Sequence, residues 1–178
     1  MNRLLRQTAA TLASLLAMSA APAFAQTAGF ALPADLMPST QQAPQVARQK
    51  RIDDALAKKQ YTEALAELDK DVASQPRNAQ ARFQRGVALA GLGRADDAIV
   101  AFSQMTQDFP ELPEPYNNLA VLYAQQGQYD KARNALELSI RTHPSYATAH
   151  ENLGDIYAKM ASQAYDKALQ LDKSNTNA

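Results

Sequence analysis

The chain has 178 residues, enough for one domain or a short array of repeats, and 46% of them are hydrophobic, as in a folded protein. Its basic and acidic residues balance at 18 each, so the charge does not favour nucleic acid, whose binding proteins present a basic surface. The sequence contains no cysteine, which excludes disulfides, thiol catalysis and thiolate metal sites.

Residues 1–25 have the features of a secretory signal peptide. Arg3 and Arg6 form a short positive start, and an apolar stretch from Leu12 to Ala21 follows them. This stretch is too short to cross a hydrocarbon layer of about 30 Å. Ala23-Phe24-Ala25 then supplies small residues at both recognition positions of a cleavage site. We therefore expect export, cleavage, a periplasmic location and no membrane insertion of the mature chain.

Residues 26–44 differ in composition from the rest of the chain. Prolines recur among Ala, Thr, Gln and Ser, with no helical periodicity. Because proline fixes φ and restricts the preceding residue, we expect a flexible, extended linker. Three apolar residues leave open a second interpretation, in which this segment docks in a groove of the folded part: Phe30, Leu32 and Leu36.

From residue 45 the sequence repeats with a period of 34 residues. Prolines recur at this spacing, and so do alanines that are each followed by a large apolar residue four positions later. These residues are Pro76, Pro110 and Pro144, Ala64, Ala98 and Ala132, and Leu68, Phe102 and Leu136. The pattern resembles the tetratricopeptide repeat, a helix–turn–helix hairpin of 34 residues. The resemblance divides the folded domain, residues 45–173, into repeats at 45–78, 79–112 and 113–146, an altered unit at 147–173 and a polar tail at 174–178.

The resemblance implies an all-α solenoid, a right-handed superhelix of three hairpins with a long C-terminal capping helix. In each hairpin a small residue such as Gly86 or Ala98 lies where the two helices cross closely. Gly93 and Gly127 suit the left-handed residue that ends a first helix. Five tyrosines fall at repeat-packing positions and are expected in the core: Tyr61, Tyr123, Tyr129, Tyr157 and Tyr165.

The first repeat departs from the pattern. Ile52 takes the place of the close-contact glycine or alanine, and Lys59 takes the place of the turn glycine. We therefore expect its first helix to be present but loosely packed.

The last unit departs from the repeat pattern at the position of the turn between its two helices. Neither glycine nor proline follows Gly154, and Ala161 stands where the previous repeat has Gly127. We therefore predict one helix from Ala147 to Leu171 that caps the third repeat. One stripe of this helix should carry the packing: Leu153, Tyr157, Met160, Ala164 and Leu171.

The sequence contains no glycine-rich phosphate loop and no nucleophile motif. The two histidines, His143 and His150, are not accompanied by carboxylates at a ligand spacing, so we expect no metal site. Enzyme activity and a cofactor are not expected.

By resemblance, the first helices line a concave groove that binds a segment of another protein. The apolar pair Phe83 and Val87 on its wall favours such contact. A clamp for a terminal carboxylate needs a lysine paired with an asparagine on a first helix, and this sequence has no such pair. The predicted groove residues are Gln80, Phe83, Val87, Asn117, Val121, Gln125, Glu151 and Asp155.

This surface is compatible with two functions. The first is an adaptor or scaffold of the bacterial cell envelope that binds a protein or peptide in the groove. The second is a structural protomer that self-associates without a groove ligand, and its partner is then another copy of the chain in a homo-oligomer. A chain with this charge is expected to bind no nucleic acid.

Overall fold

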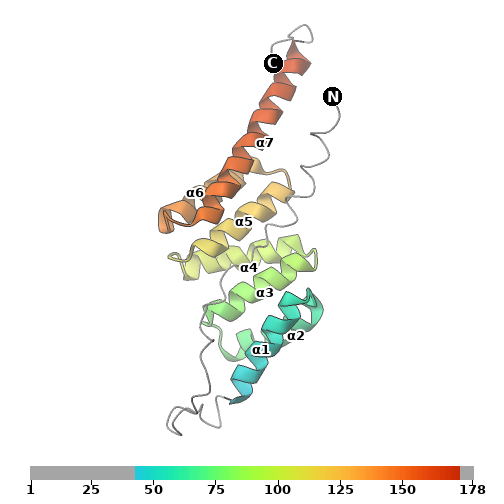
Figure 1. Ribbon diagram of the computed structural model, residues 1–178, viewed down its shortest axis with the longest axis vertical. Helices are drawn as coiled ribbons and strands as arrows, with labels where there is room; N and C mark the ends of the chain where they lie inside the picture. The colour runs from blue at the N-terminus through green and yellow to red at the C-terminus, as the bar shows by residue number, and fades with distance from the viewer. Residues whose placement is uncertain (1–42, 173–178) are drawn as a thin grey trace, which may run out of the picture.

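The computed structural model describes residues 43–172, and over this range the chain is entirely helical, with no strand. The predicted signal peptide, most of the linker and the tail lie outside these residues. The helices stack in chain order from α1 to α7 (Figure 1), which confirms the predicted all-α solenoid. They are α1 (Ala43–Ala57), α2 (Tyr61–Ser74), α3 (Ala79–Gly91), α4 (Ala95–Asp108), α5 (Pro113–Gln125), α6 (Tyr129–Thr142) and α7 (Ala147–Leu171).

The turns of the second and third hairpins are made by glycine. Gly93 and Gly127 have φ angles of 73° and 72°, the left-handed conformation that was predicted to end α3 and α5. Proline opens α5 at Pro113, where a missing N–H costs little. In the first repeat Lys59 makes the same turn with φ 58°. The hairpin register is therefore set locally by the residues at the turns.

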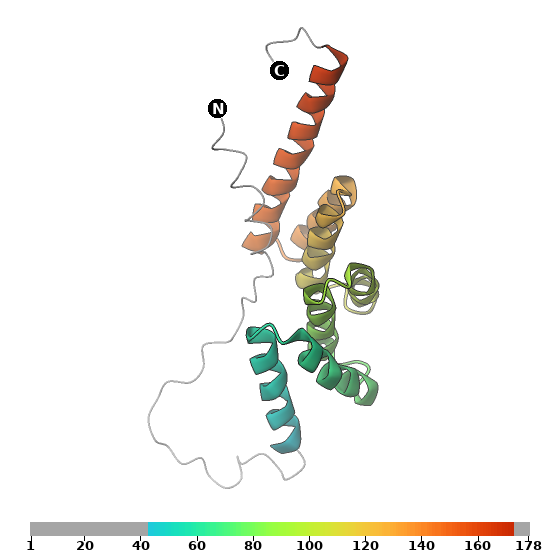
Figure 2. The ribbon, with the colours of Figure 1, turned by 90° about the vertical axis from the view of Figure 1, so that its right-hand side faces the viewer.

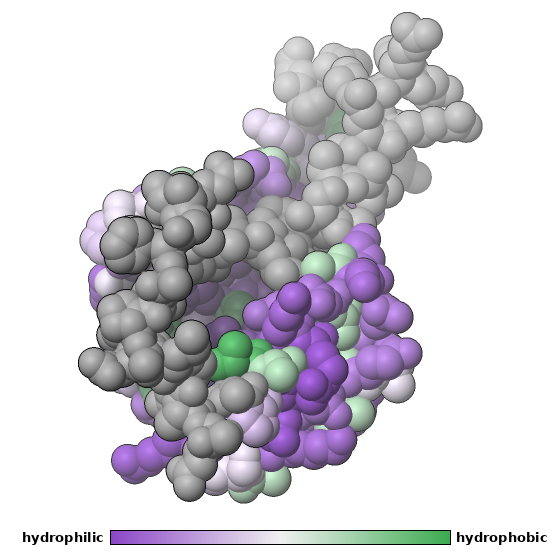
Figure 3. All heavy atoms as spheres, turned by 60° about the horizontal axis from the view of Figure 1, so that its bottom comes forward, coloured by the Kyte–Doolittle hydropathy of each residue, from purple (hydrophilic) through white to green (hydrophobic). Residues whose placement is uncertain are grey.

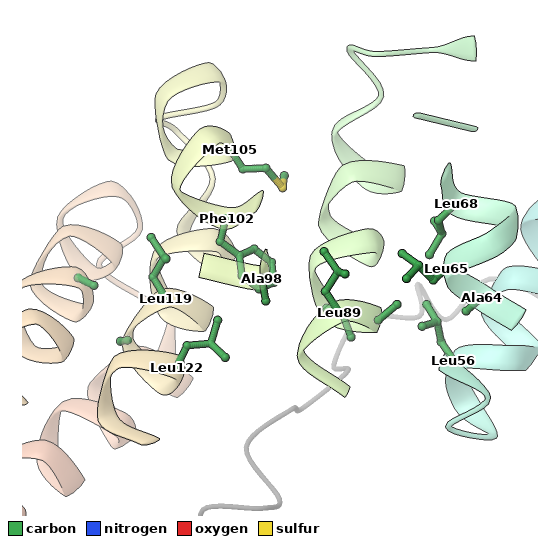
Figure 4. Packing of buried hydrophobic residues seen from close by; sticks show 14 of the residues in the cluster. Leu56, Ala64, Leu65, Leu68, Leu89, Ala98, Phe102, Met105, Leu119 and Leu122 are labelled. Carbon is green, nitrogen blue, oxygen red and sulfur yellow. The ribbon is translucent and has the colours of Figure 1, made fainter. Parts of the chain in front are cut away.

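A hydrophobic core runs through the stack of hairpins (Figure 4). Phe102 is fully buried at the centre of the second hairpin, between α3 and α4. A Cβ added to Gly86 would lie 2.6 Å from Cε1 of the Phe102 ring, so only glycine permits this approach. The predicted close crossing of the two helices is confirmed at this position.

The first repeat is packed at the position where its sequence departs from the pattern. Ile52 is fully buried, in the same cluster as Ala64. On the surface of this hairpin, Arg48 of α1 pairs with Asp71 of α2 at 2.6 Å. Isoleucine itself fills the crossing where other repeats have a small residue. The rest of α1 agrees with the predicted loose packing, because only Ile52 and Leu56 of this helix belong to the core, fewer than in α3 or α5. The helix also begins at Ala43, so the last two residues assigned to the linker are helical.

The last unit is one straight helix of 25 residues, α7, with the predicted bounds. Its first half packs on α6 and α5 through Ala149, Asn152 and Ile156. Its second half continues beyond α6 (Figures 1 and 2).

The predicted packing stripe of α7 is only partly correct. Leu153 and Met160 pack against the core. Tyr157 is 50% exposed, Leu171 is 76% exposed, and Ala164 is exposed as well. Tyr165, predicted in the core with Tyr157, is 60% exposed. These side chains are exposed because α7 does not fold back as a second helix that would cover them.

Candidate binding groove

Successive first helices are joined on one side of the array by side-chain hydrogen bonds. Gln49 of α1 donates from Nε2 to Gln84 Oε1 of α3 at 3.0 Å. Asn152 of α7 donates from Nδ2 to Asn117 Oδ1 of α5 at 2.8 Å. These bonds link α1 to α3 and α5 to α7, and the surface formed by the first helices α1, α3, α5 and α7 is the predicted wall of the groove.

The wall begins with a polar cluster between α1 and α3. Asp53 Oδ1 accepts hydrogen bonds from Gln49 Nε2 at 2.8 Å and from Gln84 Nε2 at 2.7 Å. All three side chains are half-buried. Gln84 was not among the predicted groove residues, because it lies one position beyond Phe83 in the repeat register. Its neighbour Gln80, which was predicted, is exposed.

The apolar pair in the middle of the wall is less open than predicted. Val87 is only 9% exposed. Phe83 is half-buried, with its ring centroid 5.6 Å from that of Phe102 and tilted by 54°. Phe83 therefore joins the core to the groove surface and keeps part of its ring exposed. Figure 3, which looks toward the α1–α2 end, shows hydrophobic residues in a recess with hydrophilic residues beside it.

Between α5 and α7 the wall holds a pair of buried amides. Asn117 and Asn152 are 3% and 4% exposed. Asn117 was predicted to be a hydrogen-bonding group for a partner, but its Oδ1 is already occupied by Asn152. Within the described residues, Oδ1 of Asn152 is buried without a hydrogen-bond partner. Asn152 was not predicted, although asparagine also occurs 34 residues earlier, at Asn118.

Beside this amide pair lies a small hollow with a volume of about 20 Å³. Its lining is apolar apart from two residues of α7. Val121, a predicted groove residue, is 8% exposed and contributes to it. The complete lining is Ala120, Val121, Ala124, Leu136, Asn152, Asp155 and Ile156.

The C-terminal end of the wall carries acidic side chains. Glu151 and Asp155 of α7 are exposed, as is Gln125 of α5. Nearby, burial raises the pKa of Tyr146, and the Glu114 carboxylate raises it further. The Tyr146 hydroxyl is therefore neutral at physiological pH and adds no charge to this acidic end.

Within residues 43–172 no cluster of three or more His, Cys, Asp or Glu is placed to hold a metal ion. In the same range, no helix has both the length and the apolar character needed to cross a membrane. His150, one of the two histidines, has its Nε2 2.9 Å from the Pro144 carbonyl oxygen, at the turn that precedes α7.

Two sequence models of the tetratricopeptide repeat match the chain, one over residues 50–113 and one over residues 89–153. Together they span more than half of its 178 residues. The tetratricopeptide repeat domain-containing protein PYG7, chloroplastic, of Arabidopsis thaliana is 28% identical over 133 residues. That match covers 70% of this chain and 44% of the relative, so the chain spans less than half of the relative's length.

Solved structures of similar fold include proteins described with bound peptides. YrrB, described as a TPR protein with an unusual peptide-binding site, has a TM-score of 0.52 and 29% identity, covering 55% of this chain and 50% of its own. The first TPR of Spaghetti (RPAP3), bound to the HSP90 peptide SRMEEVD, has a TM-score of 0.60 and 16% identity, covering 71% and 98%. MamA has a TM-score of 0.56 and 22% identity, covering 68% and 74%. The similarity to the last two concerns the fold alone.

Proposed function

This chain belongs to the tetratricopeptide-repeat family, and from that premise we propose that it is an adaptor that holds an extended segment of another protein in its groove. The observation that carries the proposal is Phe83, whose ring packs on Phe102 in the core and keeps part of its surface exposed on the wall that also carries the exposed Glu151 and Asp155. An exposed apolar surface with polar groups around it is typical of a protein-binding site.

The groove also suggests the chemistry of the segment. Phe83, half-buried in the middle of the wall, offers a surface for one apolar side chain. The exposed Glu151 and Asp155 favour basic or neutral residues at the α7 end. No lysine is paired with an asparagine one turn away at the clamp positions of the first helices, so a terminal carboxylate is disfavoured. The peptide-binding site reported for YrrB supports a peptide as the class of ligand.

We place this adaptor in the bacterial periplasm, with a protein of the cell envelope as its partner. The support is the signal-peptide pattern of residues 1–25, which lie outside the described residues. The intact mass of the protein in the periplasmic fraction should correspond to residues 26–178. Full-length protein retained in the cytoplasm would contradict this location.

Charge reversal at the acidic end tests the groove. Glu151→Lys/Asp155→Lys changes two exposed positions on its wall, and Glu63→Lys/Glu111→Lys changes two exposed positions on α2 and in the α4–α5 turn. Both double variants alter the charge equally. A partner captured from envelope extract by the wild type should bind the groove variant at least tenfold more weakly, measured by calorimetry.

The control variant should bind that partner with unchanged affinity, and circular dichroism should show equal helicity for all three proteins. A groove variant that retains the partner while the control variant loses it would place the binding site outside the groove.

A further inference from the structure

A second apolar stripe runs along the exposed side of α7, and at its first residue, Leu153, it adjoins the face that packs on the third hairpin. Tyr157 and Tyr165 are 50% and 60% exposed on this stripe, and Leu169 is 41% exposed. At 3.6 residues per turn, Ala161 in its centre lies about 140° around the helix from the buried Ile156. The stripe is therefore accessible while α7 remains packed on α5 and α6.

The same residue pattern is covered elsewhere in this chain. Tyr61–Leu65 of α2 and Tyr165–Leu169 of α7 share the order Tyr-x-x-Ala-Leu. In α2 the alanine and leucine, Ala64 and Leu65, are 1% and 8% exposed, because α2 packs against neighbouring helices on both sides. In α7 the corresponding Leu169 is exposed. The end of α7 thus has the character of a second helix that no first helix covers.

The first half of α7 shows the complementary feature. Gly154 lies two repeat periods after Gly86, at the position where a first helix meets its own second helix. A Cβ added to Gly86 would collide with Phe102, whereas one added to Gly154 would meet no atom of the described residues within 4 Å. A glycine inside a helix costs about 1 kcal/mol relative to alanine, and here no contact among residues 43–172 compensates it. The single helix α7 therefore exposes two surfaces that would face each other in a complete hairpin. One is the first-helix surface at Gly154, and the other is the second-helix surface at Tyr165 and Leu169.

These surfaces are arranged symmetrically about Ala161. At the positions of the stripe, residues 153–169 carry the same kinds of side chain in both directions from this alanine. A two-fold interface requires such self-complementarity, since residue i contacts residue j and j contacts i. Going outward, the matched pairs are Ala158 and Ala164, Tyr157 and Tyr165, Gly154 and Ala168, and Leu153 and Leu169.

We propose that α7 of one copy of the protein binds α7 of a second copy in antiparallel orientation, with the two-fold axis at Ala161. Gly154 of one copy then lies opposite Ala168 of the other, the same types as Gly86 and Ala98 within the second hairpin. Alanines at the centre permit a close approach, at about 8 Å between helix axes. Each copy supplies the second helix that the other lacks, as in a domain-swapped dimer.

The flanks of the stripe are compatible with this pairing. Asp155, Lys159, Asp166 and Lys167 are two acidic and two basic residues, so neither copy presents an excess of one charge. The stripe from Leu153 to Leu169 is about 24 Å long at 1.5 Å per residue. One helix pair of this length is a small interface, so the dimer should dissociate on dilution. This inference concerns a surface outside the groove and goes beyond the proposed function.

Disulfide trapping tests the register. Because the sequence contains no cysteine, Ala161→Cys introduces a single thiol. The two-fold axis would place this thiol next to the same thiol of the second copy. Asp166→Cys introduces an equally exposed thiol about 140° around the helix. Under mild oxidation the purified Ala161→Cys protein should become a disulfide-linked dimer, and Asp166→Cys should stay largely without an intermolecular disulfide. Equal trapping of both variants would overturn the register.

Sedimentation equilibrium tests the association itself. The wild type should be dimeric at about 100 μM, and Ala161→Glu, which places two carboxylates together on the axis, should weaken dimerisation at least tenfold with unchanged helicity. A wild type that is monomeric at every concentration, including one whose own residues 26–42 cover the stripe, would overturn the proposal. A monomeric wild type that still binds its partner in the groove would overturn this inference and leave the proposed function intact.

Discussion

Gly86 and Gly154 occupy the same position in the repeat, two periods apart, and their surroundings differ completely. In the second hairpin α4 returns along α3 and places the Phe102 ring against Gly86. In the last unit α7 continues straight, and no atom of the described part of the chain comes within 4 Å of a Cβ added to Gly154. A small residue at this position therefore forms a surface that fits a second helix. A separate feature of the chain decides whether the same repeat unit supplies that helix.

That separate feature is the turn. Gly127 adopts the left-handed conformation that ends α5, so α6 can fold back on it. Ala161, one period later, lies inside α7. The left-handed conformation costs about 1–2 kcal/mol for a residue with a Cβ, whereas alanine is the best helix former. The replacement of glycine by alanine thus favours a continuous helix over a hairpin.

The largest difference between the two regions should appear when an aromatic ring is removed from each. Phe102→Ala leaves a cavity in the second hairpin and should lower the free energy of unfolding by about 3–5 kcal/mol. Tyr165→Ala removes a side chain that is 60% exposed and should change it by less than about 0.5 kcal/mol. Urea melts at low protein concentration measure both. Equal losses would mean that α7 packs on its own chain.

Substitution of Gly86 and of Gly154 by alanine should change the free energy of unfolding in opposite directions. Gly86→Ala forces a methyl group into the Phe102 ring and should cost about 1–3 kcal/mol. Gly154→Ala meets no neighbour and should stabilise α7 by up to about 1 kcal/mol. Denaturant midpoints of the dilute proteins test the signs. A loss of stability in both variants would contradict the open position of Gly154.

Exchanging glycine and alanine at the two equivalent turn positions, 127 and 161, should lower the free energy of unfolding by a similar amount in each case. Gly127→Ala places a Cβ in the left-handed conformation and should destabilise the third hairpin by about 1 kcal/mol. Ala161→Gly weakens the interior of α7 by about the same amount. Thermal melts followed by circular dichroism measure both changes. A stabilising Ala161→Gly would indicate that the last unit prefers a hairpin.

The smallest effect concerns the ion pairs of the first hairpin, which α7 does not share. Hydrogen bonding to Lys70, assisted by Arg51, lowers the pKa of the Glu67 carboxyl. A lowered pKa stabilises the fold above the ordinary glutamate pKa of about 4.3, and this contribution is lost as the pH falls through the folded-state value. Between pH 5 and pH 3, Glu67→Gln should therefore lose slightly less stability than the wild type. Urea melts across this range test the sign, and identical pH profiles would contradict the pairing.

The sequence by itself determined the helices, the hairpin turns and the continuous last helix. These features depend on local causes, namely the 34-residue period, the left-handed glycines, the prolines at helix ends and the missing turn glycine at Ala161. The family and its groove-forming helices could also be predicted from this pattern. The groove residues themselves were only partly predictable.

Burial was decided by tertiary structure, because it depends on which helix lies opposite each side chain. Asn117 is a buried partner of Asn152 rather than a free groove residue, because α7 packs on α5. Tyr165 has the sequence context of a buried tyrosine and is exposed, because no helix among residues 43–172 covers that side of α7. Repeat patterns define a surface that fits another helix, but only the three-dimensional path of the chain determines whether that helix is present.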